Sequence, residues 1–274
     1  MSSPPFSIVI RTLNSAATLG QVLAALRLDA GDQLVIVDSG STDGTLALAR
    51  EHGAEIVPLR RDQFTYGRAL NRGFAAARHD WVLSLSSHTV PLAEDFLVRY
   101  RRAVAGFPTS VTAVVGPLVN NVHDVAVRSG ITYFEGDDLR QGFGFGAGNP
   151  NALYRRSAWG LRPFDEILGG GEDLHWYLAA LRAGETVAAV HAAQVRYISR
   201  APAKDFVRKG RVDFRAAAAL IEPHQPSFGG FVTHLAKLGL YVLLGRAGWR
   251  DARNSAAHYY GTWLEARALR RAKS

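Results

Sequence analysis

Two short stretches carry the side chains with the clearest chemistry, and the first is SLSSHTVP at residues 84–91. It comes off the apolar run WVLSL, so Ser86, Ser87 and His88 are expected where a strand ends. Hydroxyl and imidazole groups in such a place can hydrogen-bond a ligand, and a neutral imidazole can also bind a metal ion.

The second stretch is GGGEDLHW, which places Glu172 and Asp173 at the start of a predicted helix, after three glycines. Paired carboxylates in a partly closed cleft can act as acid or base, because burial and a like charge raise a carboxyl pKa. The structural alternative is a favourable first helical turn, where the helix dipole stabilises acidic side chains.

Strands and helices alternate along the first hundred residues. Apolar and β-branched runs predict strands, and apolar residues at helical spacing predict helices. This alternation is typical of a mostly parallel sheet, whose ligands bind beyond the carboxyl ends of the strands. Asn14, Asp38, Arg60 and the 86–88 triplet follow predicted strands and are expected at that edge. The predicted strands are 7–13, 34–37, 54–58 and 81–85, the helices are 18–28, 45–52 and 67–78, and 151–157 is a strand turning into a helix.

Two loops are predicted near this edge. In the turn DSGSTDGT, Ser41 or Thr42 is expected to cap the following helix, and Asp43 to hold the turn through side-chain to backbone hydrogen bonds. The glycine-rich stretch 136–150, GDDLRQGFGFGAGNP, predicts a flexible loop near a site, although it does not match a GxGxxG phosphate motif.

Composition indicates a folded α/β protein. The 274 residues are 47% hydrophobic, and no apolar run approaches the roughly 18 residues of a spanning helix. The chain has no cysteine, which excludes a disulfide framework, a thiolate nucleophile and a cysteine metal site. No basic segment precedes the first apolar stretch, so we expect a cytoplasmic protein.

The net charge of +8 is concentrated in the C-terminal segment. Leu, Tyr and Trp with flanking Arg there predict amphipathic helices that either bind an anionic membrane surface or pack against protein. A second basic stretch, residues 200–215, contains no recognisable nucleic-acid module, so no nucleic-acid partner is expected.

Taken together, these segments resemble the inverting, nucleotide-sugar-dependent glycosyltransferases of family two, which have the GT-A fold. The resemblance runs from about residue 6 to about residue 184, and within the family the helix segment and Pro91 look most like bacterial rhamnosyltransferases. It implies a GT-A-like (Rossmann-like) α/β fold with a mostly parallel sheet flanked by helices. The matching segments are SIVIRTLN, VIVDSGSTDGT, FTYGRALNRGFAAAR, WVLSLSSHTVP, NPNALYRRSAW and GGGEDLHW.

The resemblance assigns roles to these residues. Sugar transfer requires a held nucleotide, a neutralised leaving diphosphate and a deprotonated acceptor hydroxyl. Asp38 resembles the residue that recognises the nucleobase, with a turn cap as its alternative. The nucleotide-sugar pocket is implied to include Thr12, Asn14, Arg68, Asn71, Ser86 and Ser87, and for Arg68 the alternative is a solvated helix side chain.

The acceptor side of the site follows from the same resemblance. Asp173 is implied to be the catalytic base, with Glu172 as the other candidate. Trp176 either offers its ring to an acceptor sugar or belongs to the helix core, where Tyr177 and Leu181 are expected.

The motif that binds a divalent cation is where this chain departs most from the family pattern. Relatives carry Asp-x-Asp where this chain has Ser86, Ser87 and His88, so His88 is the expected ligand for Mn²⁺ or Mg²⁺, and imidazole suits Mn²⁺ better. Because only neutral imidazole ligates, activity is expected to fall below about pH 6.5. A histidine that relatives often carry later is replaced near Tyr197 or Ile198. The alternative is a leaving group neutralised by Arg60, Arg61 or Arg68.

We therefore expect a catalytic domain over residues 1–200 and a helical extension over 201–274. The expected function is inverting transfer of a sugar from a nucleotide-diphosphate donor to a glycan or lipid-linked acceptor, in cell-surface polysaccharide synthesis. The expected location is cytoplasmic, with a peripheral position on the inner membrane face as the membrane-binding alternative. The rival function is a nucleotide-sugar or glycan-binding protein with impaired catalysis, because the carboxylates at 86–88 are missing.

Overall fold

The computed structural model describes residues 4–119, 130–136, 148–198, 207–208, 210–212, 214–215, 228–243 and 249–273. Most of the glycine-rich loop expected at 136–150 lies outside the described residues. So do the expected domain boundary at 200/201 and part of the basic stretch 200–215.

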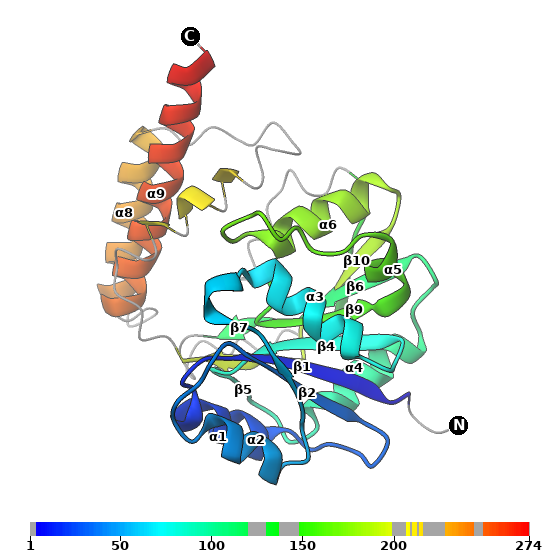
Figure 1. Ribbon diagram of the computed structural model, residues 1–274. Coiled ribbons are helices and arrows are strands. Elements are labelled where there is room, and N and C mark those ends of the chain that lie inside the picture. The colour runs from blue at the N-terminus through cyan, green and yellow to red at the C-terminus, as the bar shows by residue number, and fades with distance from the viewer. Residues whose placement is uncertain are drawn as a thin grey trace.

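A central sheet carries the fold, and in the described residues it has eight strands in the order β3-β2-β1-β4-β9-β6-β10-β8 (Figure 1). β1 lies parallel to β2 and β4, β2 to β3, and β6 to β10, whereas β9 and β8 are antiparallel to their neighbours. The mostly parallel sheet is confirmed. The strands are β1 (Phe6–Thr12), β2 (Gln33–Asp38), β3 (Glu55–Pro58), β4 (Trp81–Ser86), β6 (Val111–Val115), β8 (Ile131–Phe134), β9 (Asn151–Arg155) and β10 (Thr186–Val190).

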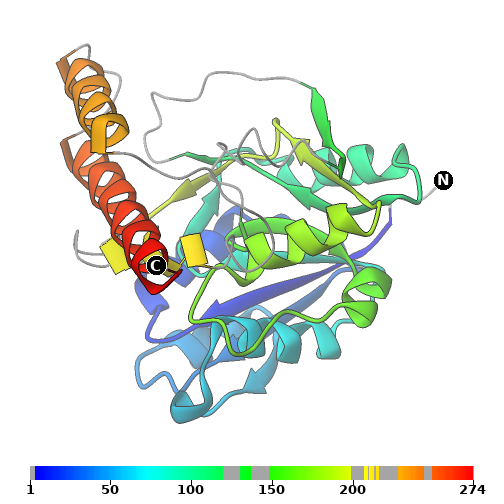
Figure 2. The same ribbon diagram turned by 90° about the horizontal axis from the view of Figure 1, so that it is seen from above.

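Helices cover both faces of this sheet (Figures 1 and 2). One apolar core joins the sheet to α1 (Ala16–Ala25), α2 (Thr45–Glu51) and α4 (Phe96–Ala105). A second core on the other face joins it to α3 (Tyr66–Ala76), α5 (Arg156–Leu161) and α6 (Glu172–Arg182). A short 3₁₀ turn, η1 (Arg61–Gln63), leads into α3.

The alternation of side chains along β1 decides which residues reach the site. Ile8 and Ile10 are fully buried in the first core, and Val9 is fully buried in the second. Because side chains alternate across a strand, Arg11 lies on the same face as Val9, toward α3 and α6. This apolar strand therefore carries a cation to the carboxyl edge of the sheet.

A small sheet follows the serine-histidine triplet directly. It contains β5 (Thr89–Pro91), β11 (Val195–Tyr197) and β7 (Leu118–Val119) in the order β5-β11-β7. The Ile198 N–H donates to the His88 carbonyl oxygen at 2.8 Å. The backbone of the triplet is thus fixed from a part of the chain more than a hundred residues away.

The predicted cap of α2 is wrong. Gly44 occupies the N-cap position, and no side chain of the described residues caps the helix there. Asp43 instead binds the starts of two helices, because its Oδ1 accepts from the Thr45 N–H of α2 at 3.0 Å and its Oδ2 accepts from the Ala16 N–H of α1 at 3.1 Å. The structural role expected of Asp43 is confirmed.

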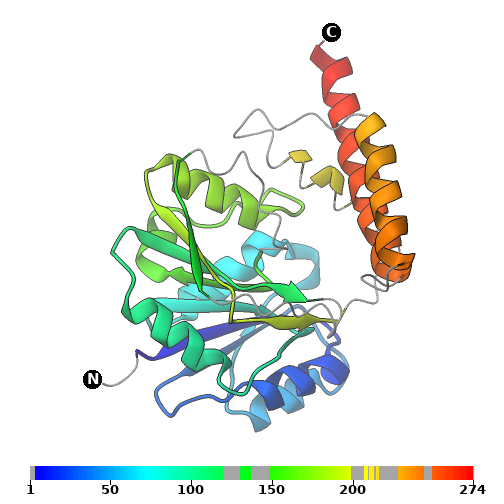
Figure 3. The same ribbon diagram turned by 180° about the vertical axis from the view of Figure 1, so that it is seen from behind.

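The C-terminal part contains two long helices, α8 (Phe228–Leu243) and α9 (Trp249–Lys273), which lie side by side (Figure 3). The helices predicted for the C-terminal segment are present over 228–243 and 249–273, and the division into domains at 200/201 stays a prediction. Glu265 accepts hydrogen bonds from Arg211 and Arg215, so α9 packs against that preceding segment. Across the described part of the chain, no helix is both long and apolar enough to cross a bilayer.

Candidate active site

Asp38 at the end of β2 is fully engaged in its own turn. Its carboxylate accepts from Thr12 Oγ1 at 2.8 Å, Ser41 Oγ at 2.5 Å, the Gly40 N–H at 3.0 Å and the Ser41 N–H at 2.8 Å. A carboxylate has about four acceptor positions, so these bonds use its capacity. The residue is only 4% exposed. The contacts of Asp38 and Thr12 are therefore those of the turn-cap alternative.

Asn14 fastens the end of β1 to the same turn. Its backbone has φ 47, a left-handed conformation that asparagine tolerates better than most residues. Its Oδ1 accepts from the Thr42 N–H and its N–H donates to Ser41 Oγ, both at 2.8 Å. The ends of β1 and β2 thus form one rigid unit.

The serine-histidine triplet reaches this edge, as the order of strands predicts. Ser86 and Ser87 are buried, and Ser87 Oγ donates to Ser15 Oγ at 2.9 Å. The His88 ring is half-buried and stands edge-on to the Tyr197 ring, with 4.8 Å between centroids. The triplet is therefore a structured part of the edge.

The two carboxylates at the start of α6 differ in environment, and Asn149 connects them. Asn149 Nδ2 donates to Glu172 Oε1 at 2.9 Å, while its backbone N–H donates to Asp173 Oδ2 at 3.0 Å. Glu172 is buried and Asp173 is half-buried. Burial, and then the negative charge of Asp173, raises the pKa of Glu172.

Glycines shape the backbone around Glu172 and Asp173. Gly170 and Gly171 have φ 152 and φ 73, which side chains rarely adopt, and they turn the chain into α6. A Cβ on Gly148 would lie 2.5 Å from Asp173 Oδ2. Only a glycine at 148 therefore leaves room for the Asp173 carboxylate in its observed position.

Arg11 places a cation at this edge. Its NH1 lies 3.8 Å from Glu172 Oε1, and its guanidinium carbon lies 5.3 Å from the centroid of the Tyr66 ring. The Arg11 side chain is 11% exposed, and within the part of the chain that the structure describes, its Nε and NH1 atoms have no hydrogen-bond partner. β1 thus places a positive charge between the starts of α3 and α6.

The expected divalent-cation site does not fit these surroundings. Within the described ranges, no three His, Asp or Glu side chains could share a metal ion. Burial and then the Arg11 charge lower the pKa of His88 to about 4, so the guanidinium is close enough to affect the imidazole. It would repel a dication at the same place. We derive no step through a metal at His88.

Because the pKa of His88 in the folded protein is about 4, we no longer expect activity to fall below pH 6.5 through this residue. We expect an effect on stability instead. Relative to a His88→Gln variant, the free energy of unfolding should decrease by about 3 kcal/mol from pH 7 to pH 4. In that window the unfolded imidazole, with its ordinary pKa of 6.5, binds a proton before the folded one does. Urea unfolding at several pH values measures the difference. Replacement of exposed His52 by Gln is the control, and parallel curves for wild type and His88→Gln would refute the effect.

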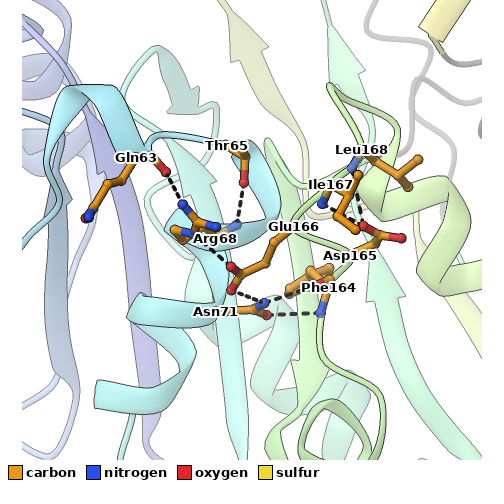
Figure 4. A network of polar contacts seen from close by, with 9 residues as sticks. All are labelled: Gln63, Thr65, Arg68, Asn71, Phe164, Asp165, Glu166, Ile167 and Leu168. Carbon is orange, nitrogen blue, oxygen red and sulfur yellow. Dashed lines mark hydrogen bonds and ion pairs between the residues drawn. The ribbon is translucent and has the colours of Figure 1, made fainter.

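Arg68 and Asn71 of α3 bind the loop that precedes α6 (Figure 4). Arg68 Nε donates to Glu166 Oε2 at 2.7 Å, and Asn71 Nδ2 donates to Glu166 Oε1 at 3.0 Å. Asn71 also donates to the Phe164 carbonyl and accepts from the Phe164 N–H and Trp159 Nε1. Both side chains expected in the nucleotide pocket thus hold the 164–166 loop, and Arg68 remains about one-third exposed.

Trp176 requires a correction. Its side chain was expected to offer a ring to an acceptor sugar or to join the core, and at 1% exposure it is in the core. It packs edge-on against Tyr154, and its Nε1 donates to the Arg162 carbonyl. Tyr177 and Leu181 are buried with it, as expected.

Three residues of the site were missed from the sequence: Arg11, Asn149 and Glu166. Arg11 had a detectable signal, because it is a charge inside the apolar strand SIVIRTL. Asn149 lay within the recognised segment NPNALYRRSAW without a role, and Glu166 had no local signal.

The layered, mostly parallel sheet and its strand order define a GT-A-like fold. A mannosyltransferase from Pyrobaculum calidifontis, solved with GDP-Man and Mn²⁺, matches with a TM-score of 0.64 at 16% identity, over 98% of this chain and 87% of that one. Glucosyl-3-phosphoglycerate synthase from Mycobacterium tuberculosis, solved with Mn²⁺, UDP and glucosyl-3-phosphoglycerate, matches with a TM-score of 0.60 at 20% identity, over 81% and 82%.

The chain belongs to glycosyl transferase family 2, whose family model matches residues 7–160. A PGL/p-HBAD biosynthesis glycosyltransferase of Mycobacterium tuberculosis is 40% identical over 106 residues, which are 36% of this chain and 41% of that protein. An uncharacterized glycosyltransferase of the same species is 32% identical over 149 residues, 46% of this chain and 66% of that protein. The first match thus spans about two fifths of its relative's length.

Proposed function

We propose that this protein transfers a sugar from a nucleotide-diphosphate donor to a glycan or lipid-linked acceptor with inversion at the anomeric carbon. The observation that carries the proposal is the position of Asp173. It is half-buried, and the Asn149 N–H holds its carboxylate beside the carboxyl edge of the sheet. A carboxylate held in this way can take the proton of an acceptor hydroxyl as that hydroxyl attacks the face opposite the leaving group.

The different surroundings of the two carboxylates support a division of labour. Glu172 is buried, accepts from Asn149 and has Arg11 as its charged neighbour, so we assign it a positioning role. Asp173 is more exposed, so we assign it the role of base. The carboxylate that this chemistry needs as base is present, which favours catalysis over the binding-only alternative.

The nucleotide is proposed to bind beyond the carboxyl ends of β1, β2 and β4. Asp38 and Asn14 would shape this pocket by fixing the 38–42 turn, and Ser86 and Ser87 would form its wall. The partly exposed guanidinium of Arg68 would reach the donor from α3. Thr12 supports Asp38 and Asn71 supports the 164–166 loop, so we propose that both act through these contacts.

The biological setting stays a prediction. Cell-surface polysaccharide synthesis and a donor like that of bacterial rhamnosyltransferases are proposals that follow from the resemblance of the motifs. A cytoplasmic location and binding of a membrane surface through the basic C-terminal segment are also predictions from the sequence.

The function is tested by screening UDP-, GDP- and dTDP-sugars for a rise in melting temperature, since a ligand bound only by the folded state stabilises it. A donor that binds is then incubated with glycan and lipid-linked acceptors, and the anomeric configuration of the product is determined by NMR. We expect transfer with inversion. Binding without transfer or donor hydrolysis would support the binding-only rival, and a product of retained configuration would contradict the mechanism.

A further inference from the structure

Arg11 is a mostly buried cation whose hydrogen-bonding capacity is largely unused. Its side chain is 11% exposed, and neither Nε nor NH1 has a hydrogen-bond partner among the described residues. Its contact with Glu172 Oε1, at 3.8 Å, is within ion-pair range but longer than a hydrogen bond. Buried guanidinium groups are normally paired and hydrogen-bonded, because an unsatisfied buried charge is costly. The unused donors of Arg11 therefore point to a ligand.

The position of Arg11 indicates which ligand this is. It precedes Thr12 at the carboxyl end of β1, with Tyr66 at the start of α3 on one side and Glu172 at the start of α6 on another. Its charge also acts on His88 at the end of β4. These elements meet where the diphosphate of a donor would lie in the proposed function.

We propose that Arg11 binds the diphosphate of the nucleotide-sugar donor. Its positive charge would neutralise the leaving diphosphate, in place of a cation held by an Asp-x-Asp motif. This inference rests on the proposed function. Arginine suits the task because its charge is permanent and its planar fork of donors matches phosphate oxygens. The Tyr66 ring supports the guanidinium on one side.

The donor, the acceptor, Arg11 and Asp173 account for every bond, electron pair and proton of the proposed transfer. The bond between the anomeric carbon and the β-phosphate oxygen breaks, and its electron pair stays on that oxygen, beside Arg11. The acceptor oxygen forms the new bond to the anomeric carbon, and its proton passes to Asp173. No redox partner or further reactant is needed.

The competing explanation is that Arg11 serves only as the counterion of Glu172. The two roles differ in what a double substitution does. If Arg11 were only a counterion, Arg11→Gln would leave Glu172 unpaired, and adding Glu172→Gln would restore ligand binding. If Arg11 binds the diphosphate, the double variant keeps the defect while regaining stability, because no buried carboxylate is left unpaired.

The experiment measures binding of UDP, GDP and dTDP, and of the nucleosides uridine, guanosine and thymidine, by calorimetry in EDTA. For the diphosphate that wild type binds best, we expect Arg11→Gln and the Arg11→Gln/Glu172→Gln double variant to lose about tenfold or more in affinity. Affinity for the matching nucleoside should be unchanged. Arg27→Gln, which removes an exposed arginine between α1 and β2 that pairs with exposed Glu94, is the matched control and should bind like wild type.

Three results would overturn the proposal. Diphosphate binding that disappears in EDTA and returns with Mn²⁺ would assign the leaving group to a metal. Wild-type affinity in the double variant would make Arg11 a counterion only. If wild type bound none of the three diphosphates with or without Mn²⁺, the proposed function itself would fail, and the role of Arg11 with it.

Discussion

Asp173→Asn should lower turnover by about 10²-fold or more while donor affinity stays near that of wild type. The amide keeps the shape of the side chain and can still accept from the Asn149 N–H, but it cannot take a proton from the acceptor. Steady-state kinetics with the donor found by the ligand screen, together with calorimetric binding of the same donor, separates the two quantities.

Asp80→Asn is the matched control for this substitution. Asp80 lies just before β4, at the amino edge of the sheet, and its side chain is 54% exposed beside Arg155. The control should retain both turnover and donor affinity. Near-normal turnover in Asp173→Asn would exclude Asp173 as the base and leave Glu172 as the next candidate to test.

Gly148→Ala should lower turnover by about 10²-fold through a single added methyl group, since a displacement of about 1 Å can cost that much. The new Cβ would lie 2.5 Å from Asp173 Oδ2, so the carboxylate must move. Gly160→Ala on α5 is the control, because a Cβ there would have no atom of the described residues around it within 4 Å. It should leave turnover unchanged.

A double-mutant cycle tests whether Gly148 acts through Asp173. If it does, Gly148→Ala should cause little further loss in an Asp173→Asn background, because the group it displaces no longer acts as base. Losses that multiply would mean that the methyl group disturbs a different part of the site. Circular dichroism and thermal unfolding of each variant confirm that the fold is retained.

Sequence by itself determined the order and type of the elements that build the sheet edge. Predicted strands 7–13 and 81–85 correspond to Phe6–Thr12 and Trp81–Ser86, and predicted helix 67–78 corresponds to Tyr66–Ala76. These patterns are readable because strand and helix periodicities and turn residues are local properties of the chain. The same locality placed the 86–88 triplet at a strand end and Glu172 and Asp173 in a first helical turn.

Only the tertiary structure decided what those side chains contact. Asp38 satisfies its own turn, Trp176 belongs to the core, and Arg68 pairs with Glu166, which is 98 residues away in the chain. Arg11 meets Glu172 because the face of β1 that carries Val9 belongs to the same apolar core as α6. Such pairings depend on how the elements pack across the sheet, and no local periodicity encodes them. The contact of Arg11 with Glu172 is therefore visible only in the folded protein, as is the crowding of Gly148 against Asp173.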